Sequence, residues 1–213
     1  MSHIVLLGDS VFDNISYTQG APDVVAQLGS SLPAGWRASL RAIDGSTAND
    51  IESQVASVPS DATHLVLSVG GNNALLVAEV LDTPVSSTAE AFRLMADVRE
   101  QFEAEYSSAV DACLRLGLPL TVCTVYSGNF PDADFNRRAG IALAVFNDVI
   151  LQAALARSLD IIDLRAVCTL PTDFANPIEP SAAGGSKIAS TIVRFVAQKE
   201  PWRGTRVSGF KLA

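Results

Sequence analysis

A continuous apolar run near the start of the chain, Ile4–Leu7, ends abruptly in the turn Gly8-Asp9-Ser10. Such a run, with no polar alternation, is typical of a parallel strand that is buried on both faces. In open α/β sheets the ligand crevice lies beyond the carboxyl ends of the strands. The hydroxyl of Ser10 is therefore expected at the edge of a sheet where folds of this kind perform their chemistry.

Two further glycine-bearing turns follow strand-like runs in the same way. Asp44-Gly45-Ser46 comes after Trp36–Ile43, and Gly70-Gly71-Asn72-Asn73 comes after His64–Val69. Because the carboxyl ends of parallel strands share one edge, the three turns should converge there.

Strand-like runs alternate with helical patterns along the whole chain, which predicts a parallel sheet with helices on both faces. The sequence shows neither repeats nor a domain boundary. We therefore expect one domain over residues 1–200, and a C-terminal tail over 201–213 that could derive partly from cloning. The predicted strands are 4–7, 36–43, 64–69, 120–125 and 160–164, and the predicted helices are 23–32, 47–55, 88–116, 134–157 and one from Ser181 onward.

The longest predicted helix, Thr88–Leu116, carries one apolar stripe at helical spacing. The predicted helix Asp134–Arg157 turns a second stripe inward. The two stripes consist of Ala91, Leu94, Met95, Val98, Phe102 and Tyr106, and of Phe146, Val149 and Ile150.

Composition narrows the class of protein. The 213 residues are 48% hydrophobic and 18% charged, which is typical of a globular domain. The net charge of −8 argues against a nucleic-acid partner. A strand starting at residue 4 leaves no room for a secretory signal, and we expect no apolar run to reach the length of a membrane span. Cys113, Cys123 and Cys168 lack C-x-x-C spacing, so we expect buried, reduced thiols and a cytoplasmic location.

The three turns resemble the first three sequence blocks of the SGNH (GDSL-type) hydrolase superfamily, with Gly8-Asp9-Ser10, Gly45 and Gly70-x-Asn72 at the matching places. The resemblance spans nearly the whole chain. It implies a flavodoxin-like, three-layer α/β/α sandwich with a central parallel sheet of about five strands. It also implies an activity among esterases, lipases, thioesterases and carbohydrate deacetylases.

The resemblance gives these residues roles. Ser10 would be the nucleophile, and the oxyanion hole would combine the backbone N–H groups of Ser10 and Gly45 with the side-chain amide of Asn72. Fixed donors of this kind are worth roughly 3–4 kcal/mol each. The residues alone also allow purely structural interpretations, because Ser10 or Asn72 could cap a helix and Gly45 could be an ordinary turn glycine.

The chain departs from the family at its last block, D-x-x-H, where it has Asn176-Pro177-Ile178-Glu179. The only histidines, His3 and His64, stand at strand starts. At roughly 3.3 Å per residue each lies about 16 Å from the carboxyl edge. Neither can reach Ser10.

Glu179 is therefore the candidate general base, held by Asn176 through an amide hydrogen bond. A carboxylate is a weaker base than imidazole unless burial raises its pKa. Alternatively, Glu179 is a solvated carboxylate near a helix N-terminus.

The sequence thus predicts a serine-dependent hydrolase of small-molecule esters, with Ser10, Glu179 and Asn176 as catalytic residues and no cofactor or metal. Short acyl groups are expected, because no apolar lid segment is visible. The alternative is a weakly active or inactive relative that binds a small acyl or sugar ligand. A third reading is slow hydrolysis by Ser10 with water alone. The sequence does not indicate an oligomeric state.

Overall fold

The structure is a computed structural model, which describes residues 1–196 and 207–208. Its strands are β1 (Ser2–Gly8), β2 (Trp36–Leu40), β3 (His64–Ser68), β4 (Leu120–Cys123), β5 (Asp160–Ile162) and β6 (Val207–Ser208). Its α-helices are α1 (Val24–Ser31), α2 (Ile51–Val55), α3 (Gly71–Leu76), α4 (Thr88–Leu114), α5 (Ala133–Ala156) and α6 (Ala182–Val196). Short 3₁₀ helices cover Ile15–Tyr17, Ala48–Asp50, Ala78–Asp82, Leu164–Ala166 and Pro171–Asp173.

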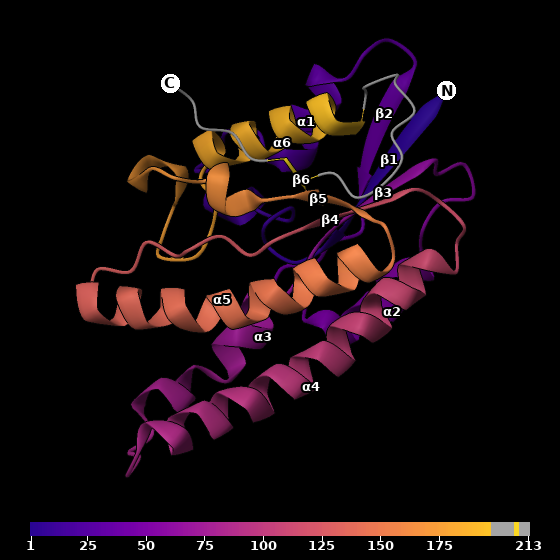
Figure 1. Ribbon diagram of the computed structural model, residues 1–213. Helices are drawn as coiled ribbons and strands as arrows, with labels where there is room; N and C mark the ends of the chain where they lie inside the picture. The colour runs from indigo at the N-terminus through magenta and orange to yellow at the C-terminus, as the bar shows by residue number, and fades with distance from the viewer. Residues whose placement is uncertain (197–206, 209–213) are drawn as a thin grey trace.

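The strands form one sheet in the order β2-β1-β3-β4-β5-β6, and every pair is parallel. Figure 1 shows α1 and α6 on one face of this sheet and α2, α4 and α5 on the other. The predicted three-layer α/β/α sandwich is confirmed. The sheet gains one strand over the five expected, because Val207–Ser208 of the predicted tail pair with β5.

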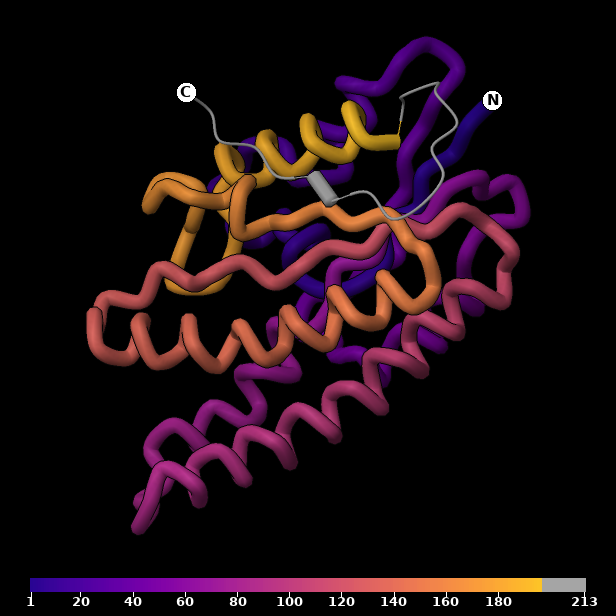
Figure 2. Tube along the Cα trace, in the orientation of Figure 1, coloured from indigo at the N-terminus to yellow at the C-terminus, as the bar shows by residue number. Residues whose placement is uncertain are grey.

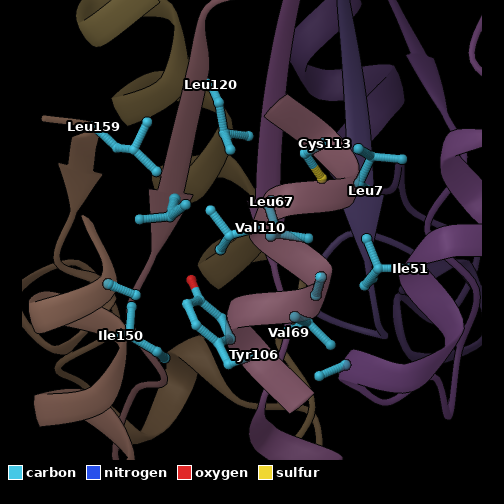
Figure 3. Packing of buried hydrophobic residues seen from close by; sticks show 14 of the residues in the cluster. Leu7, Ile51, Leu67, Val69, Tyr106, Val110, Cys113, Leu120, Ile150 and Leu159 are labelled. Atoms are coloured by element: carbon cyan, nitrogen blue, oxygen red, sulfur yellow. The ribbon is translucent and has the colours of Figure 1, made fainter. Parts of the chain in front are cut away.

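Alternating side chains of β1 supply two separate cores. Val5 and Leu7 pack with α2, α4 and α5, whereas Ile4 and Leu6 pack with α1 and α6. Successive side chains of a strand point to opposite faces, so a strand with helices on both sides must be apolar at every position. Figure 3 shows the first of these cores, with Tyr106 of α4 packed among strand side chains.

Four of the five predicted strands are shorter than the runs that predict them, whereas β1 extends beyond its run at both ends. The run 36–43 is a strand only to Leu40, and the runs 120–125 and 160–164 end at Cys123 and Ile162. Side chains take over the backbone pairing at one of these ends. Asn147 of α5 accepts from the N–H of Val125 at 2.8 Å and donates to its carbonyl at 2.9 Å.

Helices α4 and α5 extend beyond the sheet, as the tube in Figure 2 shows for the residues around the start of α4. Their apolar stripes therefore have two functions. Phe102 and Tyr106 of α4, like Phe146 of α5, are buried in the core. Met95 and Val98, which are closer to the start of α4, instead line a cavity.

Helix α5 is long and apolar enough, by length and composition alone, to cross a membrane. This corrects the expectation that no run reaches that length, although a single such helix is weak support for a membrane span. Its core residues Phe146, Val149 and Ile150 are buried, as predicted, and other apolar residues of the helix line the cavity. Packing inside the domain thus accounts for much of its composition.

Candidate active site

The turn after β1 is fixed from two sides. Gly8 has φ +130°, and a Cβ there would lie 1.8 Å from the carbonyl oxygen of Ser68. Only glycine can occupy this position. From α2, the side chain of Gln54 accepts from the N–H of Gly8 and donates to its carbonyl, both at 2.8 Å. Ser10 follows this turn, is 7% exposed and lines the cavity.

Asn72 lies in the first turn of α3, directly after β3, and lines the same cavity as Ser10. Its Nδ2 donates to the carbonyl oxygen of Ser46 at 2.9 Å. A carboxamide nitrogen carries two hydrogens, so one remains for a ligand. This bond also brings the turn after β2, which contains Gly45, against the turn after β3.

Gly45 lies on the exposed part of its turn, with φ +82°, and is not among the cavity-lining residues. Its place is beside the site, one residue from Ser46. The next residue of the third block, Asn73, is structural. It accepts from the N–H of Ala48 at 3.0 Å and donates to Glu105 of α4 at 2.7 Å.

The loop before α6 carries Glu179 to Ser10. The hydroxyl of Tyr126 donates to the carbonyl of Ile178 at 2.6 Å, and Asn14 donates to the carbonyl of Pro180 at 3.1 Å. Two neighbours of Glu179 are therefore held by side chains from other loops. The sequence offered no signal for either bond.

Asn176 differs from the expectation. Its Oδ1 accepts from the backbone N–H groups of Ile178 and Glu179, at 2.9 and 2.8 Å. The predicted bond from its amide to the Glu179 carboxylate is not among the bonds that the structure gives it. Asn176 thus fixes the turn in which Glu179 sits and, unlike Glu179, is not a cavity-lining residue.

Glu179 is 6% exposed and lines the cavity. Its Oε2 is buried without a hydrogen-bond partner. Burial raises the pKa of Glu179, a hydrogen bond with the Ser10 side chain partly offsets that rise, and the charge of Asp44 adds to it. The Glu179 carboxyl group, which lies beside Ser10 and has a raised pKa, is closer to what a general base requires than a solvated glutamate is.

Asp9 is a second buried carboxyl group in the cavity, 3% exposed. Its Oδ1 accepts from the N–H of Val11 at 3.0 Å, which ties the side chain to the backbone of the same turn. Burial, augmented by the charge of Glu179, raises its pKa to about 7. Sequence reasoning missed this electrostatic coupling, because a carboxylate next to a turn is usually solvated.

The cavity holds about 900 Å³, including the space that opens to solvent. Its polar lining side chains gather at one end, and apolar side chains of α3, α4, α5 and the segment between α3 and α4 form the rest of its wall. The polar set is Asp9, Ser10, Ser68, Asn72, Tyr126 and Glu179.

Both histidines lie at strand starts, as predicted. His3 is 1% exposed, with its ring bonded to Asp61 at 3.2 Å and to the Ser39 hydroxyl at 2.7 Å. His64 packs against Trp36. Neither histidine lines the cavity that holds Ser10.

The cysteines are free and buried, as expected. Within residues 1–196 and 207–208, no group of His, Cys, Asp and Glu side chains is arranged to hold a metal ion.

Residues 6–185 match the sequence model of the GDSL-like lipase/acylhydrolase family. No curated protein matches the chain. Among solved structures, an extracellular lipase from Streptomyces rimosus is 19% identical with a TM-score of 0.64, covering 92% of this chain and 99% of its own. A phospholipase A1 from Streptomyces albidoflavus is 18% identical with a TM-score of 0.66, covering 93% and 99%. An acetylxylan esterase from Geobacillus stearothermophilus is 20% identical with a TM-score of 0.62, covering 92% and 94%. These likenesses show a shared fold.

Proposed function

Because the chain belongs to the GDSL-like lipase/acylhydrolase family, whose members and structural neighbours hydrolyse esters, we propose that it is a serine-dependent ester hydrolase in which Glu179 replaces the usual histidine. The observation that carries this proposal is that Ser10, Asn72 and Glu179 line the same cavity, with the Ser10 side chain close enough to the Glu179 carboxyl group to lower its pKa.

In the first half-reaction, the Ser10 oxygen attacks the ester carbonyl carbon while the Glu179 carboxylate accepts the serine proton. Asn72 and the backbone N–H of Ser10 stabilise the oxyanion. Gly45 is left out of this role because it lies on the exposed part of its turn, outside the cavity lining. The tetrahedral intermediate then expels the alcohol oxygen, which takes the proton back from Glu179. An acyl group remains on Ser10.

In the second half-reaction, water attacks the acyl-serine carbonyl and gives a proton to Glu179. The intermediate collapses, the carboxylic acid leaves, and the proton returns to the Ser10 oxygen. Each half-reaction uses Glu179 once as base and once as acid, so the rise in its pKa that burial causes serves both steps. The substrate is a small-molecule ester, and no cofactor takes part.

The test compares p-nitrophenyl acetate hydrolysis by the wild type, Ser10→Ala and Glu179→Gln. We expect both variants to lose at least about 10²-fold in kcat/KM. Activity that depends on Ser10 but not on Glu179 would indicate a serine acting with water alone. Equal, background-level rates for all three would leave the ligand-binding module, which the lack of a histidine at the site favours.

A further inference from the structure

We propose that the substrate is an ester of a medium-length aliphatic acid with an alcohol that bears no negative charge. The proposal rests on the proposed function and adds the substrate class to it. Two independent observations carry it, one on each side of Ser10.

The first observation is the apolar wall that α5 presents to the cavity. Phe135, Ala139, Ala142, Leu143 and Phe146 line it, at spacings that place them on one face of the helix. Phe146 lies eleven positions after Phe135, so at a rise of about 1.5 Å per residue the wall is about 16 Å long. With C–C bonds of about 1.5 Å, a zigzag chain advances about 1.25 Å per carbon, so that length takes an acyl chain of up to about twelve carbons.

The facing walls are apolar as well. Met95 and Val98 of α4, with Val80 and Leu81 of the segment before it, complete this part of the cavity. A sugar or short polar acid placed here would lose its hydrogen bonds to water without replacement, at a cost of about 1–3 kcal/mol per polar group. An aliphatic chain would instead gain from burial. The proposed acyl group is therefore longer than the short one expected from the lack of a lid segment.

The second observation concerns the other side of Ser10, toward β2. Asp13 accepts from the N–H of Asp44 at 2.9 Å, and Asp44 accepts from the hydroxyl of Tyr17 at 2.6 Å. The charges of Asp44 and Glu179 act on each other and on Tyr17, whose pKa the Asp44 hydrogen bond raises. The buried, unpartnered Oε2 of Glu179 is part of the same field.

No Lys, Arg or His is among the residues that line the cavity. Sites that bind phosphate groups commonly use such cations. A phosphate-bearing alcohol, as in a phospholipid or an acyl-coenzyme A, would instead meet the carboxyl groups of Asp9 and Glu179, with the charge of Asp44 acting on Glu179 from outside the cavity lining. The alcohol side should therefore favour neutral or cationic groups.

For the acyl side, p-nitrophenyl decanoate and acetate are compared in the wild type, Ala142→Trp and Ala144→Trp. Ala142 lines the cavity, whereas Ala144 is an exposed alanine on the same helix that does not. We expect the wild type to prefer decanoate, Ala142→Trp to lower the decanoate-to-acetate ratio of kcat/KM at least tenfold, and Ala144→Trp to leave it unchanged. Thermal melting checks folding, and Ala139→Leu serves if Ala142→Trp does not fold. A wild-type preference for acetate, or equal ratios in all variants, would overturn the proposal.

Binding of 11-(dansylamino)undecanoic acid to Ser10→Ala separates this inference from the catalytic one. We expect binding that the added Ala142→Trp change abolishes and Ala144→Trp preserves. If no ester is hydrolysed and this pattern still holds, the proposed function fails and the acyl-chain cavity stands. If esters are hydrolysed but the probe does not bind, the acyl-chain cavity fails alone.

For the alcohol side, two decanoate phenyl esters are compared, one with a para-trimethylammonium and one with a para-sulfonate group. At low ionic strength we expect the cationic ester to have the higher kcat/KM by about tenfold, decreasing with added salt. Asp13→Asn/Asp44→Asn should reduce this ratio at least threefold. Asp97→Asn/Glu100→Gln removes two exposed charges of α4 and should not. A preference for the sulfonate, or equal ratios in both double variants, would overturn the charge preference.

Discussion

The two edges of the sheet hold similar polar groups, which are fully hydrogen-bonded at one edge and partly unpartnered at the other. At the amino edge, Ser39, His3 and Asp61 form a chain of hydrogen bonds in the order of a catalytic triad. At the carboxyl edge, Ser10 is beside Glu179, whose Oε2 has no partner. The comparison shows that residue types alone do not identify the active site. The triad-like chain is satisfied within the fold, whereas the serine–glutamate pair lines a cavity and keeps unused hydrogen-bonding capacity.

The largest expected difference is between the two serines. Ser10→Ala should reduce kcat/KM for p-nitrophenyl decanoate by about 10³-fold or more, as the loss of a nucleophile does. Ser39→Ala should keep it within about twofold and lower only the melting temperature, because it removes a hydrogen bond of His3. A comparable loss of activity in Ser39→Ala would show that the amino edge takes part in catalysis.

The two edges should also respond oppositely to pH. The fold raises the pKa of Asp9 from 3.8 to about 7, so the unfolded chain loses this proton first. The free energy of unfolding therefore falls as pH rises between these values. Asp9→Asn should leave the free energy of unfolding near the wild-type value around pH 4. Above pH 7 it should raise that free energy by up to about 4 kcal/mol relative to the wild type.

Asp61 supplies the opposite sign, since its hydrogen bond with Arg37 lowers its pKa. Its contribution is present above the ordinary carboxyl pKa and is lost as pH falls through its lowered value. Asp61→Asn should thus lower the free energy of unfolding at neutral pH, and this difference from the wild type should disappear in acid. Chemical denaturation at several pH values measures both, and parallel pH profiles would contradict the contrast.

Glycines at the two edges give a smaller contrast. Gly8→Ala forces a Cβ against the Ser68 carbonyl and should cost about 3 kcal/mol or more in unfolding free energy. Gly35, before β2, also has positive φ but nothing within 4 Å of the added atom. Gly35→Ala should cost about 1–2 kcal/mol. Equal costs would mean that strain, and not the close approach to β3, explains Gly8.

The smallest expected effect is on the pH profile of activity. The base must be ionised, so kcat/KM should fall about tenfold per unit below the raised pKa of Glu179 and level off above it. His64, whose pKa burial lowers, lies at the other edge. His64→Asn should leave the pH profile unchanged. A shift of the inflection of the profile in that variant would contradict the assignment of Glu179 as the general base.

Much of the fold could be predicted from local pattern. The apolar runs and the glycines that end them indicate the strands and the turn at Ser10. Helix periodicity located α4 and α5 to within a few residues. It could not tell which part of a stripe faces the core, because Met95 and Tyr106 have the same period and differ only in whether the sheet reaches them.

The candidate site was predictable where it follows strand ends and unpredictable where it depends on distant partners. Glu179 was found through the layout of its loop. The bond of Asn176 to backbone, the support from Tyr126 and Asn14, and the burial of Asp9 depend on tertiary packing. No periodicity records such contacts.

The double hydrogen bond between Gln54 and Gly8 reproduces, with one side chain, the pairing that a neighbouring strand would supply. The position of the nucleophile is consequently adjustable from a helix that contributes nothing to the cavity wall. Substitutions at residue 54 would therefore change the reaction rate without changing ligand affinity. In enzymes of this type, turnover rate and substrate preference can thus change independently.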